Sequence, residues 1–141
     1  MSIQYEPVIW SDALSTGVSV IDDQHRILVD LLNVAGQKLS GPYSKETLEE
    51  IVRDLMGYAL YHFDTEEELM LQNGYVETDQ QQHFQEHRSF STLVSSIQHR
   101  VRQGQHVSVD ELLQFLRDWL IHHVLDSDKK LGLYLNAQGV Y

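Results

Sequence analysis

Four stretches of this sequence repeat apolar residues at the spacing of an α-helix, and no stretch alternates with period two for long enough to indicate a strand. The stretches cover roughly residues 21–39, 48–69, 83–101 and 112–123. Turn signals follow the first three, at Gly41-Pro42, Asn73-Gly74 and Gly104. Because short connections make sequential helices antiparallel neighbours, the pattern predicts an all-α, up-down-up-down four-helix bundle.

The length of the chain suits one hydrophobic core. It has 141 residues, of which 42% are hydrophobic, as is typical of a folded domain. We therefore predict a single domain over 1–141. Its expected parts are an irregular N-terminal arm over 1–19, the bundle over about 20–131 and a C-terminal tail over 132–141.

Two of the predicted helices begin with a capping-box pattern. Thr78 is followed three residues later by Gln81, and Ser108 by Glu111. In this pattern the first side chain accepts a hydrogen bond from a backbone N–H in the first turn of the helix. The second side chain accepts one from the backbone N–H of the first residue. The pattern predicts that the third and fourth helices begin just after Thr78 and Ser108.

The charge of the chain argues against two classes of partner. Asp and Glu number 21 against 10 Lys and Arg, which gives a net charge of -11. Nucleic acids and anionic membranes require a cationic surface, so neither is expected to bind. No apolar run approaches the roughly 20 residues that cross a bilayer, and the N-terminus lacks the pattern of a secretory signal. We expect a cytoplasmic protein without membrane insertion.

Polar side chains interrupt the apolar face of all four predicted helices. Counting 100° per residue, each lies within about 40° of the centre of the apolar stripe on its helix. These side chains are His25, His62, Glu66, His83, His87 and His123. The chain has eight histidines in total, more than its length would ordinarily bring.

The six interrupting residues are expected at one end of the bundle. One lies near the start of the first helix, two near the end of the second, two near the start of the third and one near the end of the fourth. In an up-down-up-down bundle these helix ends coincide, and each residue lies within roughly 15 Å of that end. Burying so much polarity without partners would be costly, so a bound metal is the favoured explanation.

The spacing within two helices supports this explanation. His62 and Glu66 are four residues apart, and so are His83 and His87. Side chains separated by four residues lie on the same face of a helix and can reach the same ion.

The number of candidate ligands indicates two metal ions. Five imidazoles and one carboxylate exceed the four ligands of a tetrahedral zinc site. They suit two ions bridged by carboxylates, of which Glu66 is one. A second carboxylate would come from Asp126 or Asp128. Counting 100° per residue, Glu67 and Glu68 point away from the apolar side of their helix, so they are expected on a solvated acidic face.

These residues resemble the hemerythrin family, specifically its single-domain bacterial members. The family pattern is a lone His in the first helix, then His-x-x-x-Glu, His-x-x-x-His and His-x-x-x-x-Asp in the following three. Here it is carried by the segments IDDQHRILVDLLN, HFDTE, HFQEH and HVLDSD. The segments WSDALSTGVSVIDDQH and WLIHH are also similar, so the resemblance covers about residues 8–135. Its matching positions are His25, His62, Glu66, His83, His87, His123 and Asp128.

The resemblance implies a non-haem di-iron centre with two iron ions per chain and a bridging oxo or hydroxo group. The three histidines of the third and fourth helices would hold one iron. The histidines of the first two helices would hold the other, which would keep an open position for dioxygen. Glu66 and Asp128 would bridge. The implied function is reversible oxygen binding for storage, transport or delivery to an oxygen-using enzyme, without catalysis by this chain.

The resemblance also implies an apolar pocket beside the irons. Its candidate residues are Leu28, Phe63, Trp119 and Val124. Ordinary core packing would bury the same side chains, so the two roles are compatible.

Three other functions remain open. The chain could sense oxygen, nitric oxide or iron through a separate partner protein. It could be a di-iron oxidase, although such sites use Glu-x-x-His pairs, which this sequence lacks. The same ligands could also hold zinc or manganese in place of iron.

The choice between the two aspartates depends on the helix after His123. In a regular helix Asp126 lies near the inner face and Asp128 points nearly away from it. The family spacing selects Asp128, which requires an irregular helix. We therefore predict a π-bulge or a tightened turn between Val124 and Asp128.

The remaining histidines are expected outside the site. His122 is about 100° away from its neighbour His123, so we expect it to contact a metal ligand or to lie on the surface. His99 points away from the apolar side of its helix, and His106 follows Gly104 in a loop. Both are expected on the surface.

Overall fold

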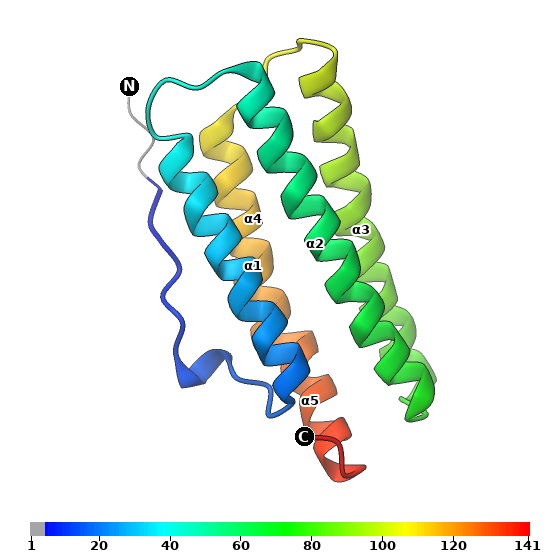
Figure 1. The fold of residues 1–141 in the computed structure, drawn as a ribbon. Helices are drawn as coiled ribbons and strands as arrows, with labels where there is room; N and C mark the ends of the chain where they lie inside the picture. Colours follow the sequence, from blue (N-terminus) through cyan, green and yellow to red (C-terminus); the bar gives the residue numbers. More distant parts are fainter. Residues whose placement is uncertain (1–4) are drawn as a thin grey trace.

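The computed structural model describes residues 5–141. Its helices are α1 (Ser19–Lys38), α2 (Lys45–Gln72), α3 (Glu77–Arg102), α4 (Val109–His123) and α5 (Lys129–Ala137). A π-helical turn, η2 (Val124–Asp128), joins α4 to α5, so that α5 continues the course of α4 (Figure 1). Helices α1 to α4 run alternately up and down, and the described residues contain no strand. The prediction of an all-α four-helix bundle is confirmed.

One of the two predicted caps is present. Ser108 caps α4, and its hydroxyl accepts the Glu111 N–H at 3.4 Å. Thr78 does not cap α3, which begins at Glu77, so that prediction is wrong. Carboxylates at Glu77 and Asp79 place negative charge in the first turn of α3, where the helix dipole favours it.

The described part of the N-terminal arm lies along α1 and contains a short 3-10 turn, η1 (Asp12–Leu14) (Figure 1). The side chain of Asn33 in α1 holds the arm by two hydrogen bonds. Its Oδ1 accepts the Val8 N–H and its Nδ2 donates to the Val8 carbonyl, both at 2.9 Å. The guanidinium of Arg26 lies over the Trp10 ring, 4.9 Å from its centroid. Residues 1–4 of the predicted arm lie outside the described residues.

The predicted C-terminal tail over 132–141 is wrong in part, because α5 continues to Ala137. Leu131 and Leu135 are fully buried on one face of α5. The Tyr134 hydroxyl donates to the Asn73 carbonyl at 2.6 Å, which ties α5 to the connection between α2 and α3. Buried apolar contacts therefore extend this helix beyond the end that its sequence pattern suggested.

Two apolar clusters enclose the level at which the polar side chains gather. The larger fills the bundle from the level of Phe63 to the end at which α1 ends and α2 begins. The smaller lies at the opposite end and consists of Val18, Ile21, Met70, Tyr75, Leu131 and Leu135. Helix α5 and the start of α1 thus close this end of the bundle and shield the polar level from water.

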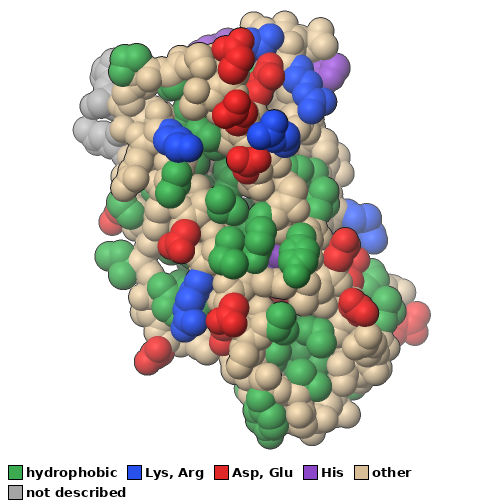
Figure 2. Space-filling model, viewed as in Figure 1, with side chains coloured by type: hydrophobic (Ala, Val, Ile, Leu, Met, Phe, Trp, Pro, Cys, Tyr) green, Lys and Arg blue, Asp and Glu red, His purple; other side chains and the backbone are tan. Residues whose placement is uncertain are grey.

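The outer surface is mixed in character. Acidic and basic side chains are interspersed over the face drawn in Figure 2, and a group of apolar side chains lies near its middle. Among the described residues, no helix has the length and apolar character needed to cross a membrane.

Candidate metal centre

Seven side chains from four helices and the π turn meet inside the bundle. Helix α1 supplies one histidine, α2 a histidine and a glutamate, α3 two histidines, α4 one histidine and η2 an aspartate. They are His25, His62, Glu66, His83, His87, His123 and Asp128, and none is more than 3% exposed. The structure therefore brings together the seven residues that match the family pattern and leaves out Asp126, the alternative carboxylate.

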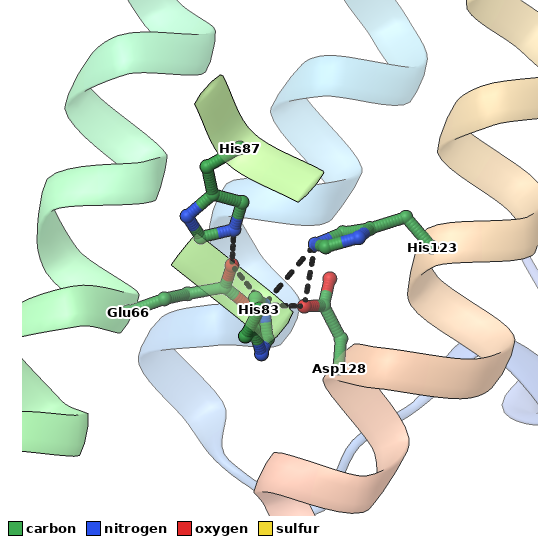
Figure 3. Close-up of side chains that lie close together, drawn as sticks. All are labelled: Glu66, His83, His87, His123 and Asp128. Atoms are coloured by element: carbon green, nitrogen blue, oxygen red, sulfur yellow. Dashed lines mark hydrogen bonds and ion pairs between the residues drawn. The ribbon is translucent and has the colours of Figure 1, made fainter. Parts of the chain in front are cut away.

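The carboxylate of Asp128 lies between histidines of three different helices. Its Oδ2 is 2.8 Å from Nε2 of His25. Its Oδ1 is 2.9 Å from Nε2 of His83 and 3.1 Å from Nε2 of His123 (Figure 3). One carboxylate thus reaches both sides of the cluster.

The carboxylate of Glu66 occupies a similar position. Its Oε1 is 3.1 Å from Nε2 of His87, 3.4 Å from Nε2 of His62 and 3.5 Å from Nε2 of His83. Its Oε2 is 3.9 Å from Nε2 of His25. All five histidines therefore turn the same nitrogen, Nε2, toward the two carboxylates.

The donor atoms form two overlapping groups. Within each group the atoms lie within 4.8 Å of one another, close enough to surround one ion. The first group consists of Glu66, His83, His87, His123 and Asp128, and the second of His25, His62, Glu66 and Asp128. The two carboxylates belong to both groups, which is the arrangement of a pair of ions with bridging carboxylates.

Several of these atoms are buried without a hydrogen-bond partner among the described residues. They include Nε2 of His25 and His62, Oε2 of Glu66 and both carboxylate oxygens of Asp128. His25 Nε2 is only 2.8 Å from Asp128 Oδ2, but the pair lacks hydrogen-bond alignment. Buried polar atoms that face one another without pairing are costly, and a cation between them would satisfy them together. The residues present therefore fit a metal centre.

The π turn η2 brings Asp128 into this cluster. In a regular helix, residues five apart are about 140° apart around the axis. Here the Lys129 N–H reaches the Val124 carbonyl, five residues back, so that His123 and Asp128 face the same side. Asp128 is fully buried, whereas Asp126 is exposed. The predicted irregularity between Val124 and Asp128 is confirmed.

The comparisons with known proteins agree with this geometry. The family model described as the hemerythrin HHE cation binding domain matches residues 16–134. The chain belongs to the hemerythrin family. It is 34% identical to a bacteriohemerythrin of Pseudomonas paraeruginosa over 121 residues, which cover 86% of this chain and 76% of that one. It is 30% identical to a bacteriohemerythrin of Methylococcus capsulatus, with 91% and 96% covered.

A solved structure shows the same fold. A crystal structure of wild-type hemerythrin superposes with a TM-score of 0.84, at 27% sequence identity, and covers 92% of this chain and 98% of that one. This hemerythrin fold, together with the cluster of histidines and carboxylates, makes the chain capable of binding metal.

Aromatic rings pack directly against two of the candidate ligands. Phe63 stacks on the His87 ring with a centroid distance of 4.0 Å, and Trp119 stacks on the His123 ring at 4.4 Å. Both aromatic residues also line an apolar cavity of about 30 Å³, and so does Leu28. Val124, the fourth predicted pocket residue, is buried but is not among the residues that line the cavity.

Three histidines of the cluster are held from behind by polar side chains. Gln24 Oε1 is 2.7 Å from Nδ1 of His62. Glu67 Oε2 is 2.8 Å from Nδ1 of His87, and Glu86 Oε1 is 2.8 Å from Nδ1 of His123. Because these oxygens accept the Nδ1 proton, the neutral form of each imidazole has its unprotonated Nε2 facing the cluster.

The sequence analysis did not identify these supporting residues. Each of Gln24, Glu67 and Glu86 is the immediate neighbour of a candidate ligand, and each supports a histidine on the next helix. Glu67 was expected on a solvated face but is half-buried against His87, so that expectation is wrong. Their position next to a candidate ligand is the one signal that the sequence offers, but His122 shows that such a neighbour can also lie on the surface.

The two buried carboxylates have opposite pKa shifts. Burial raises the pKa of Glu66 well above its usual value, and the nearby Asp128 raises it further. Burial acts in the same direction on Asp128, but the imidazoles of His123 and His25 lower its pKa well below the usual value. In the metal-free protein, the surroundings therefore favour the protonated form of Glu66 and the charged form of Asp128.

The pKa values of the histidines in the cluster are also shifted in opposite directions. Burial lowers the pKa of His87 to about 2, and the neighbouring imidazoles contribute. Burial also holds the pKa of His62 well below its usual value, with a further contribution from His25. For His123, burial acts in the same direction, but the carboxylates of Asp128 and Glu86 raise its pKa to about 9. His62 and His87 are thus neutral imidazoles, the form that binds metal.

The other three histidines lie outside the cluster. His99 and His106 are exposed, as predicted. His122 is also exposed, and its Nδ1 donates to the Asp118 carbonyl at 2.7 Å. Helical phase turns His122 outward, because it lies about 100° from the inward-facing His123.

Replacement of Glu86 by alanine tests the supporting carboxylates. Glu86→Ala leaves Nδ1 of His123 and the Ser127 hydroxyl without their shared acceptor. Loss of such a partner typically lowers metal affinity by about 10- to 100-fold, and we expect this range. The measurement is a competition titration of the metal-free protein against a chelator. Glu68→Ala is the matched control, because Glu68 lies on the exposed side of α2 and contacts Gln72. Equal affinities for the two variants would contradict the role given to Glu86.

Proposed function

We propose that this chain binds dioxygen reversibly at a pair of iron ions inside the bundle. The observation that carries the proposal is the sharing of Glu66 and Asp128 between two groups of donor atoms. A single ion would leave one of these groups unsatisfied in the core, whereas two ions would use every buried donor. The bacteriohemerythrin names of the relatives support the same choice of metal and ligand.

The two proposed metal positions are unequal. His83, His87 and His123 would hold one iron, and His25 and His62 would hold the other. The two carboxylates would bridge the irons, with an oxo or hydroxo group as a third bridge. The first group offers five protein ligands and the second offers four, so the iron beside His25 would keep an open position.

The chain would contribute a dry, apolar surrounding. Iron, when bound, would supply the reversible electron transfer that dioxygen binding requires. Phe63 and Trp119 exclude water from one side of the cluster, and α5 with the start of α1 excludes it from the other. An environment poor in water and protons disfavours irreversible loss of reduced oxygen species, which is a requirement for a carrier.

The proposed role is oxygen storage, transport or delivery to an oxygen-using enzyme in the cytoplasm. We propose that the whole chain is one such carrier domain and that it has no catalytic activity of its own. The lack of any Glu-x-x-His pair in the sequence distinguishes it from the carboxylate-rich di-iron oxidases.

An oxygenation cycle tests this function. The metal-free protein is loaded with ferrous iron under anaerobic conditions, exposed to oxygen and then returned to an inert atmosphere. We expect a visible absorption band that appears on exposure and disappears on deoxygenation over repeated cycles. Irreversible oxidation in the first cycle, or oxygen consumption that continues with an added substrate, would contradict the carrier function.

Metal binding is expected to release protons. The raised pKa of His123, about 9, leaves an additional proton on this side chain at neutral pH, and that proton must leave when His123 binds metal. The raised pKa of Glu66 acts in the same direction. The His123 proton stabilises the metal-free fold fully below its unfolded pKa, and this stabilisation is lost as the pH rises through about 9. Apparent metal affinity should therefore rise with pH from neutrality to about 9.

Calorimetry in buffers with different ionisation enthalpies measures the number of protons released. We expect at least one per chain at neutral pH, from His123, when both metal positions are filled. An affinity that does not change between neutral pH and about 9 would contradict the protonation state given to His123.

A further inference from the structure

A cation that binds at this buried cluster must reach it from the surface. The cavity beside Phe63 and Trp119 is lined by apolar side chains alone, so it offers no ligand to a hydrated ion. A hydrated divalent ion gives up its water only where oxygen or nitrogen atoms replace it. A polar route to one of the candidate ligands is therefore required.

A second cavity provides such a route. It has a volume of about 40 Å³, enough for water, and it lies between α3 and the turn η2. Its lining includes Asp79, Gln82, His83, Asp126 and Lys130. His83 is a candidate ligand, so the cavity extends from the surface to the cluster itself.

The imidazole of His83 forms the inner wall of this cavity. His83 is 2% exposed, and its Nε2 faces Asp128 at 2.9 Å. Its Nδ1, on the other side of the ring, is buried and has no hydrogen-bond partner among the described residues. His62, His87 and His123 are each held at Nδ1 by a neighbouring side chain.

His83 is therefore free of the contact that fixes those three imidazoles. His25 also has an unpaired Nδ1, but it does not line this cavity. His83 is the histidine that combines an unpaired Nδ1 with access to a polar cavity.

Charged side chains at the mouth of the cavity favour a cation. Asp126 is exposed there, and Asp79 forms an ion pair with Lys130 at 2.8 Å. The ammonium of Lys130 neutralises part of this negative charge and repels an approaching cation. The groove of about 400 Å³ beside His123 is also lined by Asp126. It is less suitable, because Glu86 holds Nδ1 of His123 and Trp119 stacks on its ring, so this imidazole cannot turn outward to capture an ion.

We propose that the cavity between α3 and η2 is the entry route for divalent metal ions, with Asp126 attracting the ion and His83 passing it inward. The imidazole of His83 turns toward the cavity, captures the ion and returns with it to the cluster. The Asp79–Lys130 ion pair limits access at the mouth. This inference rests on the proposed function only in requiring that the cluster binds metal.

The test follows the rate at which the metal-free full-length chain takes up Co²⁺, by the visible absorption of the bound ion in a stopped-flow instrument. Asp126→Asn should slow uptake and Lys130→Gln should accelerate it, each by about threefold or more at low ionic strength. Both effects should shrink at high salt. Gln82→Trp, which places a bulky ring at the mouth, should also slow uptake. The final amount of bound metal should stay unchanged.

Two variants serve as matched controls. Asp30→Asn removes an exposed carboxylate from α1, and Gln85→Trp adds the same ring to an exposed position on α3 that does not line this cavity. Neither should alter the rate by more than the scatter between wild-type preparations.

Two results would overturn the inference, and they are distinguishable. Wild-type rates in Asp126→Asn, Lys130→Gln and Gln82→Trp, with full metal content, would contradict the route alone. A wild-type chain that binds no Co²⁺ and no ferrous iron would contradict the proposed function and the route with it.

Discussion

Asp128→Asn is expected to leave the chain unable to hold two metal ions. Asp128 is fully buried, and its oxygens lie 2.8 to 3.1 Å from Nε2 of His25, His83 and His123. A neutral amide has nearly the same shape but supplies neither the negative charge nor two equivalent oxygens. We expect metal affinity to fall by more than the 10- to 100-fold that follows loss of a supporting residue, with at most one iron retained per chain.

Asp126→Asn is the matched control for this variant. It makes the same chemical change two residues away, at an exposed position on the same π turn. It should retain the full number of metal ions at equilibrium, whatever its effect on the rate of uptake. Metal content after dialysis and circular dichroism of the metal-free proteins compare binding and folding. If Asp126→Asn loses metal and Asp128→Asn keeps it, the assignment of the two aspartates is reversed.

Gly132→Ala is expected to destabilise the fold, although it adds a single methyl group. A Cβ at Gly132 would lie 2.1 Å from the Thr16 carbonyl oxygen, which is a backbone atom and cannot move alone. The substitution forces apart α5 and the segment that precedes α1. Overpacking costs about 1–3 kcal/mol, and a clash with backbone belongs to the upper part of this range. The net loss after the gain of about 1 kcal/mol from replacing a helical glycine is then about 1–2 kcal/mol.

Gly57→Ala is the control for the stability gained when alanine replaces a glycine inside a helix. Gly57 lies within α2, and no described atom lies within 4 Å of a Cβ added there. This variant should be more stable than wild type by about 0.5–1 kcal/mol. Urea unfolding of the metal-free proteins measures both free energies. A Gly132→Ala protein as stable as Gly57→Ala would show that the contact with Thr16 does not constrain the fold.

Helical phase was sufficient to predict the bundle and most of the site. The positions of His25 and His123 within their apolar stripes are set by the regular 100° step between residues, and the structure preserves that step throughout α1 and α4. The 100° step gives the wrong direction for Asp128, because the π turn adds a residue to the helix. The position of this carboxylate could therefore be inferred only from family spacing.

Other features depended on tertiary contacts that a single helix does not reveal. The burial of Leu135 and the hydrogen bond from Tyr134 extend α5 through the predicted tail. The contact between Glu67 and His87 requires the neighbouring helix, so Glu67 resembled a surface residue in the sequence. Thr78 matched a capping box by composition, but α3 begins at Glu77 and leaves it no role as a cap.

The number of iron ions per chain tests the central claim most directly. Metal-free protein is loaded with ferrous iron under anaerobic conditions, freed of excess metal, and assayed for iron and protein in the same sample. Two irons per chain are expected, because Glu66 and Asp128 belong to both groups of donors. A single iron per chain, or none, would contradict a paired site bridged by these carboxylates.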